Sequence, residues 1–302
     1  MILDAKQTRE LSDSFWAMTK TAEMGEFIDQ YTSYLRLQIL EDAFWRRLLT
    51  PKAINRSEAQ RSVDHDELVV IKDIEPELGQ VKAVVLNMKG GTRHVQFAGP
   101  RYEIPFFRIE TEEAEIKEHE KYQYEMNIVA YIRERSEKEV ATTEDLNFMH
   151  LCKTAVESTE KEVVTPDTTV TRKNLVKLFN LIDTDKLQTQ KILMNLVQFN
   201  NILAWENSEY GSNLLGEVVV NGYKHTQLLG KDFLVSNDTN KVPVNEIWGF
   251  TDQKFMGHAF LLEQDLVFSM EKHHNILSFK SWEEIAVAIG NPKSVSRMKI
   301  AG

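Results

Sequence analysis

The sequence of 302 residues predicts an α+β fold, in which helices and strands occupy separate stretches of the chain. Three observations support this fold class. Apolar residues keep helical spacing within residues 12–49, and they do so again from residue 124 onward. Two glycines between β-prone runs predict a hairpin near residue 90. The last sixty residues begin with short apolar runs of strand character.

Residues 12–49 are expected to be helical, with apolar residues on two sides. Tyr34 and Phe44 lie on the second of these stripes, and the aromatic pairs Phe15-Trp16 and Phe44-Trp45 stand near the two ends of the segment. A helix of this kind requires packing partners on both faces. The partners are either the rest of the same protein, since aromatic residues are common in cores, or neighbouring subunits.

A polar segment of mixed charge, residues 50–67, is expected to be a connector. The predicted hairpin follows, with strands at residues 81–88 and 92–97. A phosphate-binding loop is rejected at its turn, because the full glycine and lysine spacing is absent and no helix follows. The residues that form the predicted tip of the hairpin, which is basic, are Lys89, Gly90, Gly91, Arg93 and His94.

The strand expected at residues 102–109 contains Pro105, which cannot donate to a β-ladder and therefore places the strand at a sheet edge. Six glutamates follow within residues 110–120. Clusters of carboxylates can bind metal ions or perform acid–base chemistry. Here they alternate with lysines and a histidine, which indicates a solvated face instead.

Two helices are expected between residues 124 and 155, separated by a break at Val140-Ala141. Thr142 and Asp145 can cap the second helix, which would carry Phe148 and Cys152 on its inner side. Cys152 is predicted to act as a small hydrophobic residue, because no base stands on the same side of the helix.

A subdomain boundary is expected at residues 157–170, and Thr171 then caps a helix with apolar positions through Ile182. Asp183 and Asp185 resemble the start of a calcium loop, but its glycine and closing glutamate are missing. A buried strand at residues 191–196 and a short helix as far as Trp205 are expected next.

The last sixty residues contain four strand-like runs, at 247–250, 259–262, 266–270 and 275–279. A short helix is expected after them, because Ser281 and Glu284 have the spacing of a capping box. Gly290 and Pro292 would end this helix.

The composition excludes several kinds of protein. Hydrophobic residues are 42% and charged residues 27% of the chain, as in ordinary folded proteins, and no stretch approaches the roughly twenty apolar residues of a membrane span. The single cysteine excludes an internal disulfide, and no catalytic, cofactor or metal site is expected. The net charge of -10 argues against a protein that grips nucleic acid by neutralising its phosphates.

Several stretches together resemble the major capsid proteins of tailed phages, which have the Hong Kong phage type fold: "VPVNEIWGF", "KFMGHAFLLEQDL", "ILSF", "EEIAVAIGNPKSVSRMKI" and "ILMNLVQFNNILAW". Leu196 departs from the proline that such proteins often have there. The resemblance implies an N-terminal arm (1–65), an extended β-hairpin loop (66–110), a peripheral domain with a spine helix (111–165), an axial domain (166–245) and a return to the peripheral domain (246–302).

The resemblance also implies a function without enzymatic activity. Many copies would assemble, as hexamers and pentamers, into an icosahedral shell around double-stranded DNA in the virion, after assembly in the host cytoplasm. A separate scaffolding protein and a portal would be its partners, and a decoration protein could cover the shell. Deletion of residues 1–49 is expected to abolish assembly and leave a folded remainder. An encapsulin-like compartment and a soluble α+β enzyme are the alternatives.

Overall fold

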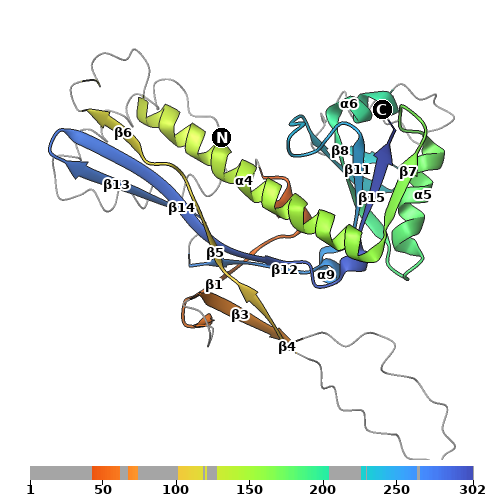
Figure 1. Cartoon of the computed structure of the whole chain (residues 1–302), viewed down its shortest axis with the longest axis horizontal. Coiled ribbons are helices and arrows are strands. Elements are labelled where there is room, and N and C mark those ends of the chain that lie inside the picture. The colour runs from red at the N-terminus through yellow and green to blue at the C-terminus, as the bar shows by residue number, and fades with distance from the viewer. Residues whose placement is uncertain are drawn as a thin grey trace, which may run out of the picture.

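The computed structural model describes residues 43–61, 67–73, 101–117, 120, 128–203, 226–228, 230–263 and 266–301 (Figure 1). The predicted hairpin strands at 81–88 and 92–97 and most of the N-terminal helical segment lie outside these residues. The described part is elongated and contains two large sheets with the helix α4 (Ile128–Thr159) between them. The 32 residues of α4 correspond to a length of about 48 Å.

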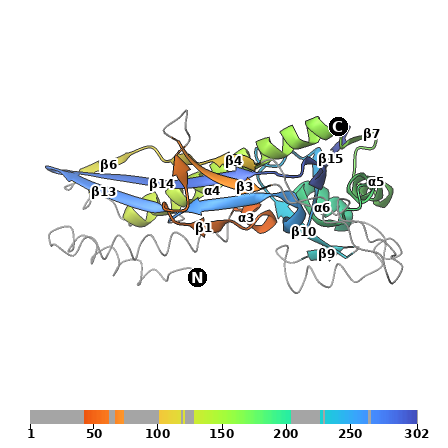
Figure 2. The ribbon, with the colours of Figure 1, turned by 90° about the horizontal axis from the view of Figure 1, so that it is seen from below.

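The first sheet is a ribbon of six strands that extends along α4 (Figure 2). Its central strand is β14 (Ile276–Ala288), which pairs with two strands along each edge. The remaining strands are β1 (Lys52–Ile54), β5 (Phe107–Glu110), β6 (Ala114–Lys117), β12 (His258–Leu262) and β13 (Val267–His273).

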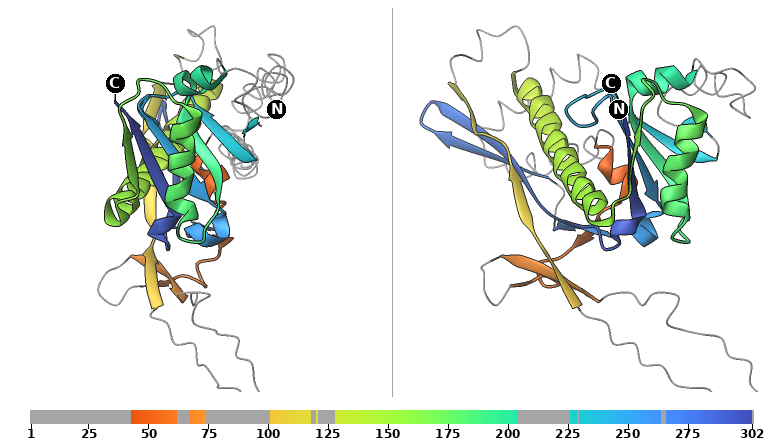
Figure 3. Two further views of the ribbon diagram at one scale, coloured as in Figure 1. Left: turned by 90° about the vertical axis from the view of Figure 1, so that its right-hand side faces the viewer. Right: turned by 45° about the vertical axis from the view of Figure 1, so that its right-hand side comes forward.

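The second sheet also has six strands, in the order β7-β15-β11-β8-β10-β9. The helices α5 (Arg172–Asp183) and α6 (Leu196–Leu203) cover one of its faces, while α4 lies toward the other (Figure 3). The strands are β7 (Glu162–Thr165), β8 (Thr189–Asn195), β9 (Thr226–Leu228), β10 (Lys231–Ser236), β11 (Glu246–Thr251) and β15 (Val295–Ile300).

A third, smaller sheet contains β2 (Gln60–Arg61), β3 (Leu68–Asp73) and β4 (Arg101–Pro105). β4 is an edge strand within this sheet, in agreement with the position predicted from Pro105. The remaining described elements are short: α3 (Trp45–Leu48), α9 (Gln253–Met256) and the 3-10 helix η3 (Pro292–Ser294). No helix among the described residues is both long enough and apolar enough to span a bilayer.

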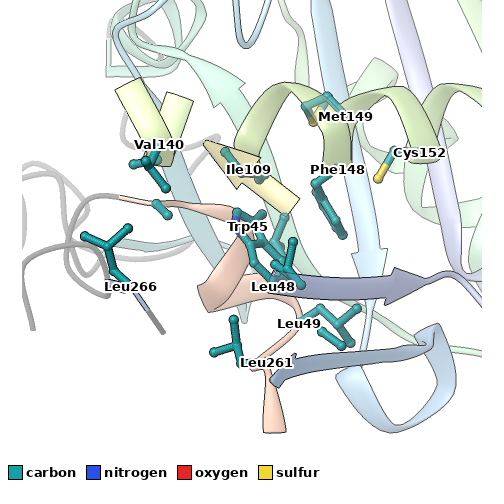
Figure 4. Packing of buried hydrophobic residues seen from close by; sticks show 14 of the residues in the cluster. Trp45, Leu48, Leu49, Ile109, Val140, Phe148, Met149, Cys152, Leu261 and Leu266 are labelled. Atoms are coloured by element: carbon teal, nitrogen blue, oxygen red, sulfur yellow. The ribbon is translucent and has the colours of Figure 1, made fainter. Parts of the chain in front are cut away.

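The main hydrophobic core lies where α4, the first sheet and one face of the second sheet meet (Figure 4). Trp45 and Phe148 are at its centre, with ring centroids 5.9 Å apart. A second core lies between the second sheet and the helices α5 and α6, and a third between the first and third sheets. The short helix α3 therefore belongs to the central core although it follows the N-terminal segment in sequence.

Many elements predicted from the sequence are confirmed. Thr171 caps α5 by accepting a hydrogen bond from the backbone N–H of Asn174, and the predicted apolar face of this helix is buried. The strand predicted at 191–196 corresponds to β8, and the four runs predicted near the C-terminus correspond to β11, β12, β13 and the start of β14.

The helix predicted at residues 281–289 is wrong, because these residues continue the long strand β14. Alternate side chains of this strand enter the core, including Phe279 and Ile285. Strand partners on both edges provide hydrogen bonds for the whole segment, and this tertiary pairing outweighs the local capping signal. Gly290 and Pro292 follow the strand instead of ending a helix, and Pro292 starts η3.

The break predicted at Val140-Ala141 is also wrong, since α4 runs through both residues and buries them in the core. Thr143 stays helical and returns a hydrogen bond to the carbonyl of Glu139 at 2.9 Å.

The predicted connector at 50–67 contains β1 and β2, and the predicted boundary at 157–170 contains β7. Two strands of the segment 246–302, β11 and β15, lie in the same sheet as the strands of 166–245.

Candidate functional site

A buried ionic junction connects three parts of the chain that are far apart in sequence. Arg46 of α3 binds Glu144 of α4 through Nε (2.8 Å) and Nη2 (2.5 Å), and its Nη2 also contacts Glu283 of β14 at 2.9 Å. The Trp45 ring N–H donates to Glu144 at 2.5 Å. The side chains of Arg46, Glu144 and Glu283 are at most 1% exposed. The junction therefore holds the start of the described chain against both α4 and the first sheet.

One guanidinium, that of Arg46, lies between the two buried carboxyl groups of Glu144 and Glu283. Burial opposes ionisation of Glu144, but its hydrogen bonds with Glu283 and Arg46 and the charge of Arg46 hold its pKa below the ordinary value. A buried arginine between two carboxyl groups satisfies several polar atoms that would otherwise lie unpaired in the core. This arrangement favours one relative placement of α3, α4 and β14.

Asp145 extends the junction toward the second sheet. Its carboxylate accepts the backbone N–H of Trp45 at 3.1 Å and pairs with Lys241, on the segment between β10 and β11, at 2.8 Å. Burial raises the pKa of Asp145 to about 6, although Lys241 opposes this shift. The sequence prediction of Asp145 as a helix cap is wrong, because the residue lies inside α4 and its oxygens bind distant groups.

A second group of ion pairs holds the end of α4 to the second sheet. Arg297 of β15 pairs with Glu162 of β7, and its guanidinium lies 5.3 Å from the ring centroid of Trp248. Lys161 pairs with Asp185, next to the end of α5. Hydrogen bonds to Lys161 and the charges of Lys161 and Lys293 hold the pKa of Asp185 below its usual value. Asp183 and Asp185, the two aspartates at the start of the rejected calcium loop, both have structural contacts. Asp185 pairs with Lys161, and Asp183 accepts hydrogen bonds from Thr189.

The face of the first sheet opposite α4 carries charged side chains around Trp282. Arg108 lies 5.1 Å from the centroid of the Trp282 ring and 3.5 Å from Glu284. Arg56 also pairs with Glu284, at 3.1 Å. These pairs are largely open to solvent, where each stabilises the fold by about 0 to 1 kcal/mol. The face is thus a polar surface with a partly buried aromatic ring, and nothing in it resembles a catalytic site.

The predicted interface residues fall into two groups. Trp45 is only 1% exposed and belongs to the core of its own chain, so its assignment to a subunit interface is corrected. Its neighbour Phe44 is half-buried and packs against the same core. The other predicted interface residues lie outside the described part of the chain: Phe15, Trp16, Tyr34, Lys89, Gly90, Gly91, Arg93 and His94.

The described residues offer no constellation for chemistry. No group of three or more histidine, cysteine, aspartate or glutamate side chains in this part of the chain is placed to hold a metal ion. Cys152 is fully buried on the core side of α4, and burial raises the pKa of its thiol, so the thiolate needed for nucleophilic attack does not form. Its predicted role as a small hydrophobic residue agrees with its place in the main core.

Sequence reasoning did not find the residues of the ionic junction. Glu144 and Glu283 lie 98 and 237 positions from Arg46 in the sequence, so no local spacing connects the three residues. One signal was present in the sequence, since Arg46 and Arg47 follow an aromatic pair in an otherwise apolar stretch. A charge at such a place indicates a buried partner.

Comparison with known proteins identifies the fold. No family model and no curated protein sequence matches the chain. Solved structures match over most of it. A structure from Mycobacterium phage Adephagia has a TM-score of 0.55 at 10% identity, covering 88% of this chain and 90% of the other. The capsid of Cyanophage P-SCSP1u has a TM-score of 0.52 at 11% identity, covering 84% and 87%.

The encapsulin SrpI from Synechococcus elongatus PCC 7942 is similar to the same degree. Its TM-score is 0.53 at 11% identity, and the alignment covers 85% of this chain and 86% of the encapsulin. Phage and encapsulin structures therefore match this chain about equally well. On the architecture described above and these matches, the chain has the Hong Kong phage type capsid fold.

Proposed function

We propose that many copies of the chain assemble into a closed icosahedral shell, and that this shell is the capsid of a tailed phage around double-stranded DNA. The observation that carries the proposal is the match of 83% to 89% of the chain to structures that include phage capsids and a gene transfer agent capsid. Shell proteins work through large repeated surfaces and not through a pocket.

The acidic balance of the chain fits a container that encloses DNA without gripping it. Lysine and arginine number 36 against 46 aspartate and glutamate. A wall that repels phosphates lets DNA be packed without sequence-specific contacts. In this proposal a separate scaffolding protein and a portal take part in assembly in the host cytoplasm, and a decoration protein can cover the finished virion.

The subunit contacts proposed from the sequence involve the N-terminal arm and the hairpin tip. Phe15, Trp16 and Tyr34 would pack on neighbouring copies, as would the exposed part of Phe44. The basic tip, Lys89 to His94, would dock on a carboxylate-bearing surface of an adjacent subunit. Charge reversal at Lys89 and Arg93 that leaves shell yield unchanged at low salt would contradict the tip contact.

Electron microscopy of the purified protein tests the proposal directly. The expected result is closed shells with pentameric and hexameric clusters of subunits. A protein that remains monomeric at high concentration, in several buffers, would overturn it. Shells purified from the natural source should contain nuclease-protected DNA.

An encapsulin-like compartment is the second candidate, and the match to the SrpI encapsulin favours it. Such a shell would contain protein cargo instead of DNA. Mass spectrometry of the shell contents separates the two functions, because an enzyme present in stoichiometric amounts with no nucleic acid would support the compartment. Neighbouring genes for portal, terminase and tail proteins would support the capsid.

A further inference from the structure

A cavity of about 410 Å³ lies between the first and third sheets, beside α9. Its walls are mixed in polarity. The apolar part comes from separate elements, with Leu49 after α3, Val70 on β3, and Ala259 and Phe260 on β12. Ile71 also lines it and is 38% exposed, so the cavity is open to solvent at an apolar rim. An open cavity of this size can accept one or two side chains of a partner.

Two lysines give this cavity a positive charge. Lys52 of β1 and Lys72 of β3 both line it, and neither has an ion pair with any carboxylate among the described residues. This contrasts with Arg56, Arg108 and Lys280 nearby on the first sheet, each of which is paired with glutamate. The cavity therefore has a mixed lining with two lysines that form no ion pair in the described part of the chain, which suits a partner that carries carboxylates.

The same chain presents such carboxylates on a rigid bulge. Between β5 and β6 the edge strand advances four residues, from Glu110 to Ala114, while β14 advances three, from Trp282 to Phe279. One extra residue is thus inserted, as in a β-bulge. Thr111 fixes it, because its backbone N–H donates to the Ser281 carbonyl at 2.9 Å and its hydroxyl oxygen accepts the Ser281 N–H at 3.0 Å.

The carboxylates of this acidic bulge, defined here as Glu112, Glu113 and Glu115, are exposed. None of the three has an ion pair among the described residues, although Glu110 next to them is paired with Lys280. A bulge also prevents a further strand from adding to the edge, so the segment is free to present side chains. The acidic bulge and the cavity are therefore complementary in charge, and no described residue forms an ion pair with the glutamates of the bulge or with Lys52 and Lys72.

They cannot meet within one copy. The bulge lies opposite Ser281 on β14, whereas Phe260 of the cavity pairs with Ala286, five residues further along and on the other edge of the strand. Five strand residues span about 17 Å, beyond the reach of a direct ion pair. Figures 1 and 2 show the same separation, with β6 toward one end of the first sheet and β12 toward the other.

We propose that the acidic bulge of one copy docks at the cavity of a neighbouring copy, with its glutamates paired to Lys52 and Lys72. This inference rests on the proposed shell, because it requires many copies side by side. The contact joins two different surfaces, so repeating it generates rings or networks of subunits instead of an isolated pair. Each subunit then makes the contact twice, once with its bulge and once with its cavity.

A charge swap tests the pairing. Lys52→Glu with Lys72→Glu should lower shell yield on the order of tenfold at low salt, and Glu112→Lys with Glu113→Lys should do the same, because each places like charges in the contact. The variant with all four changes should recover yield to within about twofold of the unmodified chain. Lys173→Glu with Lys177→Glu, at exposed positions of α5, is the control for net charge and should keep normal yield.

Cross-linking identifies the occupant. A carbodiimide joins a lysine amine to a carboxyl group only when the two are in contact, and shells made from a mixture of isotopically light and heavy copies distinguish links between copies. We expect links from Lys52 or Lys72 to Glu112, Glu113 or Glu115 of the other isotope. Links from these lysines to a different segment, or none at all, would overturn the proposed occupant.

The two levels of proposal fail separately. An unmodified chain that forms no shells overturns the proposed function and this contact with it. Normal shells from the unmodified chain and from both reversed pairs overturn the contact alone. Failure of the fourfold variant to recover, when each variant subunit keeps the circular dichroism spectrum and unfolding midpoint of the unmodified subunit, also overturns the pairing.

Discussion

Arg46 is the residue on which the central junction depends, because it is the cation shared by Glu144 and Glu283. Replacing it by methionine keeps much of its volume and leaves two buried carboxyl groups without that cation. We expect Arg46→Met to lower the free energy of unfolding by about 3 to 5 kcal/mol. Urea unfolding of the purified subunit, followed by tryptophan fluorescence, measures this change.

The matched control is an ion pair of the same helix that is open to water. Lys138 and Glu134 lie 2.7 Å apart with side chains 66% and 60% exposed, so Lys138→Met should change stability by less than about 0.5 kcal/mol. Equal effects of the two substitutions would show that Arg46 contributes no more than a surface residue. The sequence shows that Arg46 follows an aromatic pair while Lys138 stands among charged residues, but it does not reveal the two partners of Arg46.

Asp145 gives stability a specific dependence on pH. Its folded-state pKa of about 6 lies above the 3.8 of an unperturbed aspartate, so its contribution is fully present below pH 3.8 and is lost as pH rises through 6. This difference in pKa corresponds to about 3 kcal/mol. Asp145→Asn should therefore gain stability relative to the unmodified protein, by up to that amount, between about pH 4 and pH 7.

The measurement is the difference between the two unfolding free energies across that range. Taking the difference removes the contributions of Glu144, Glu162 and Asp185, whose lowered pKa values have the opposite pH dependence. A difference that stays constant from pH 4 to pH 7 would rule out titration of Asp145 in this window.

Among the elements, the joint between α9 and β12 depends on close backbone packing. A Cβ atom on Gly257 would lie 2.1 Å from the Ala288 carbonyl oxygen at the end of β14, and neither backbone can move without shifting its strand. Gly257→Ala should therefore destabilise the protein by about 1 to 3 kcal/mol or more. Thermal unfolding of the subunit would show it as a lower midpoint.

Gly249 is the comparison within the second sheet. A Cβ atom there would meet the Ser296 hydroxyl oxygen at 2.8 Å, and this hydroxyl can rotate away. Gly249→Ala should cost clearly less than Gly257→Ala. A larger destabilisation by Gly249→Ala than by Gly257→Ala would mean that the backbone between α9 and β12 can move to accommodate a Cβ atom.

The elements also show how far sequence patterns reach. Helix α5 could be predicted because its cap, its apolar stripe and its length agree. The segment 281–289 could not, because Trp282, Ile285 and Ala286 fit a helical stripe while β14 uses its alternate residues instead. What decides between them is pairing with β5 and β12, whose partner residues are 172 to 178 and 24 to 30 positions away, and no local rule contains that information.

At the scale of the whole molecule, local sequence patterns again predict some features, while others depend on contacts between distant segments. The α+β class and the capsid fold could be recognised from many weak stretches, each consistent with a strand or helix at its place. The junction of Arg46 with Glu144 and Glu283, the bulge at Thr111 and the cavity beside α9 arise only when distant segments meet. The candidate contact surfaces were therefore beyond the reach of sequence spacing.

The boundary between arm and body is a prediction at the scale of the molecule. The sequence suggested that removal of residues 1–49 would leave a folded remainder, and the burial of α3 corrects this. Trp45, Leu48 and Leu49 are each 1% exposed in the main core, and loss of one large buried side chain already destabilises a protein by about 2 to 5 kcal/mol. Deletion of residues 1–49 would remove all three, together with Arg46.

We expect the chain that lacks residues 1–49 to be insoluble or to unfold without cooperativity. The lost side chains together contribute about as much as the 5 to 15 kcal/mol by which a typical folded protein is stable. The chain that lacks only residues 1–42 keeps α3 and the ionic junction, so it should fold as a soluble subunit but form no shells, since its arm is missing. Circular dichroism and urea unfolding test the first part, and electron microscopy tests the second. Cooperative unfolding of the chain that lacks residues 1–49, at the urea midpoint of the intact subunit, would show that α3 is dispensable for folding. Normal shells from the chain that lacks residues 1–42 would show that assembly does not require the arm.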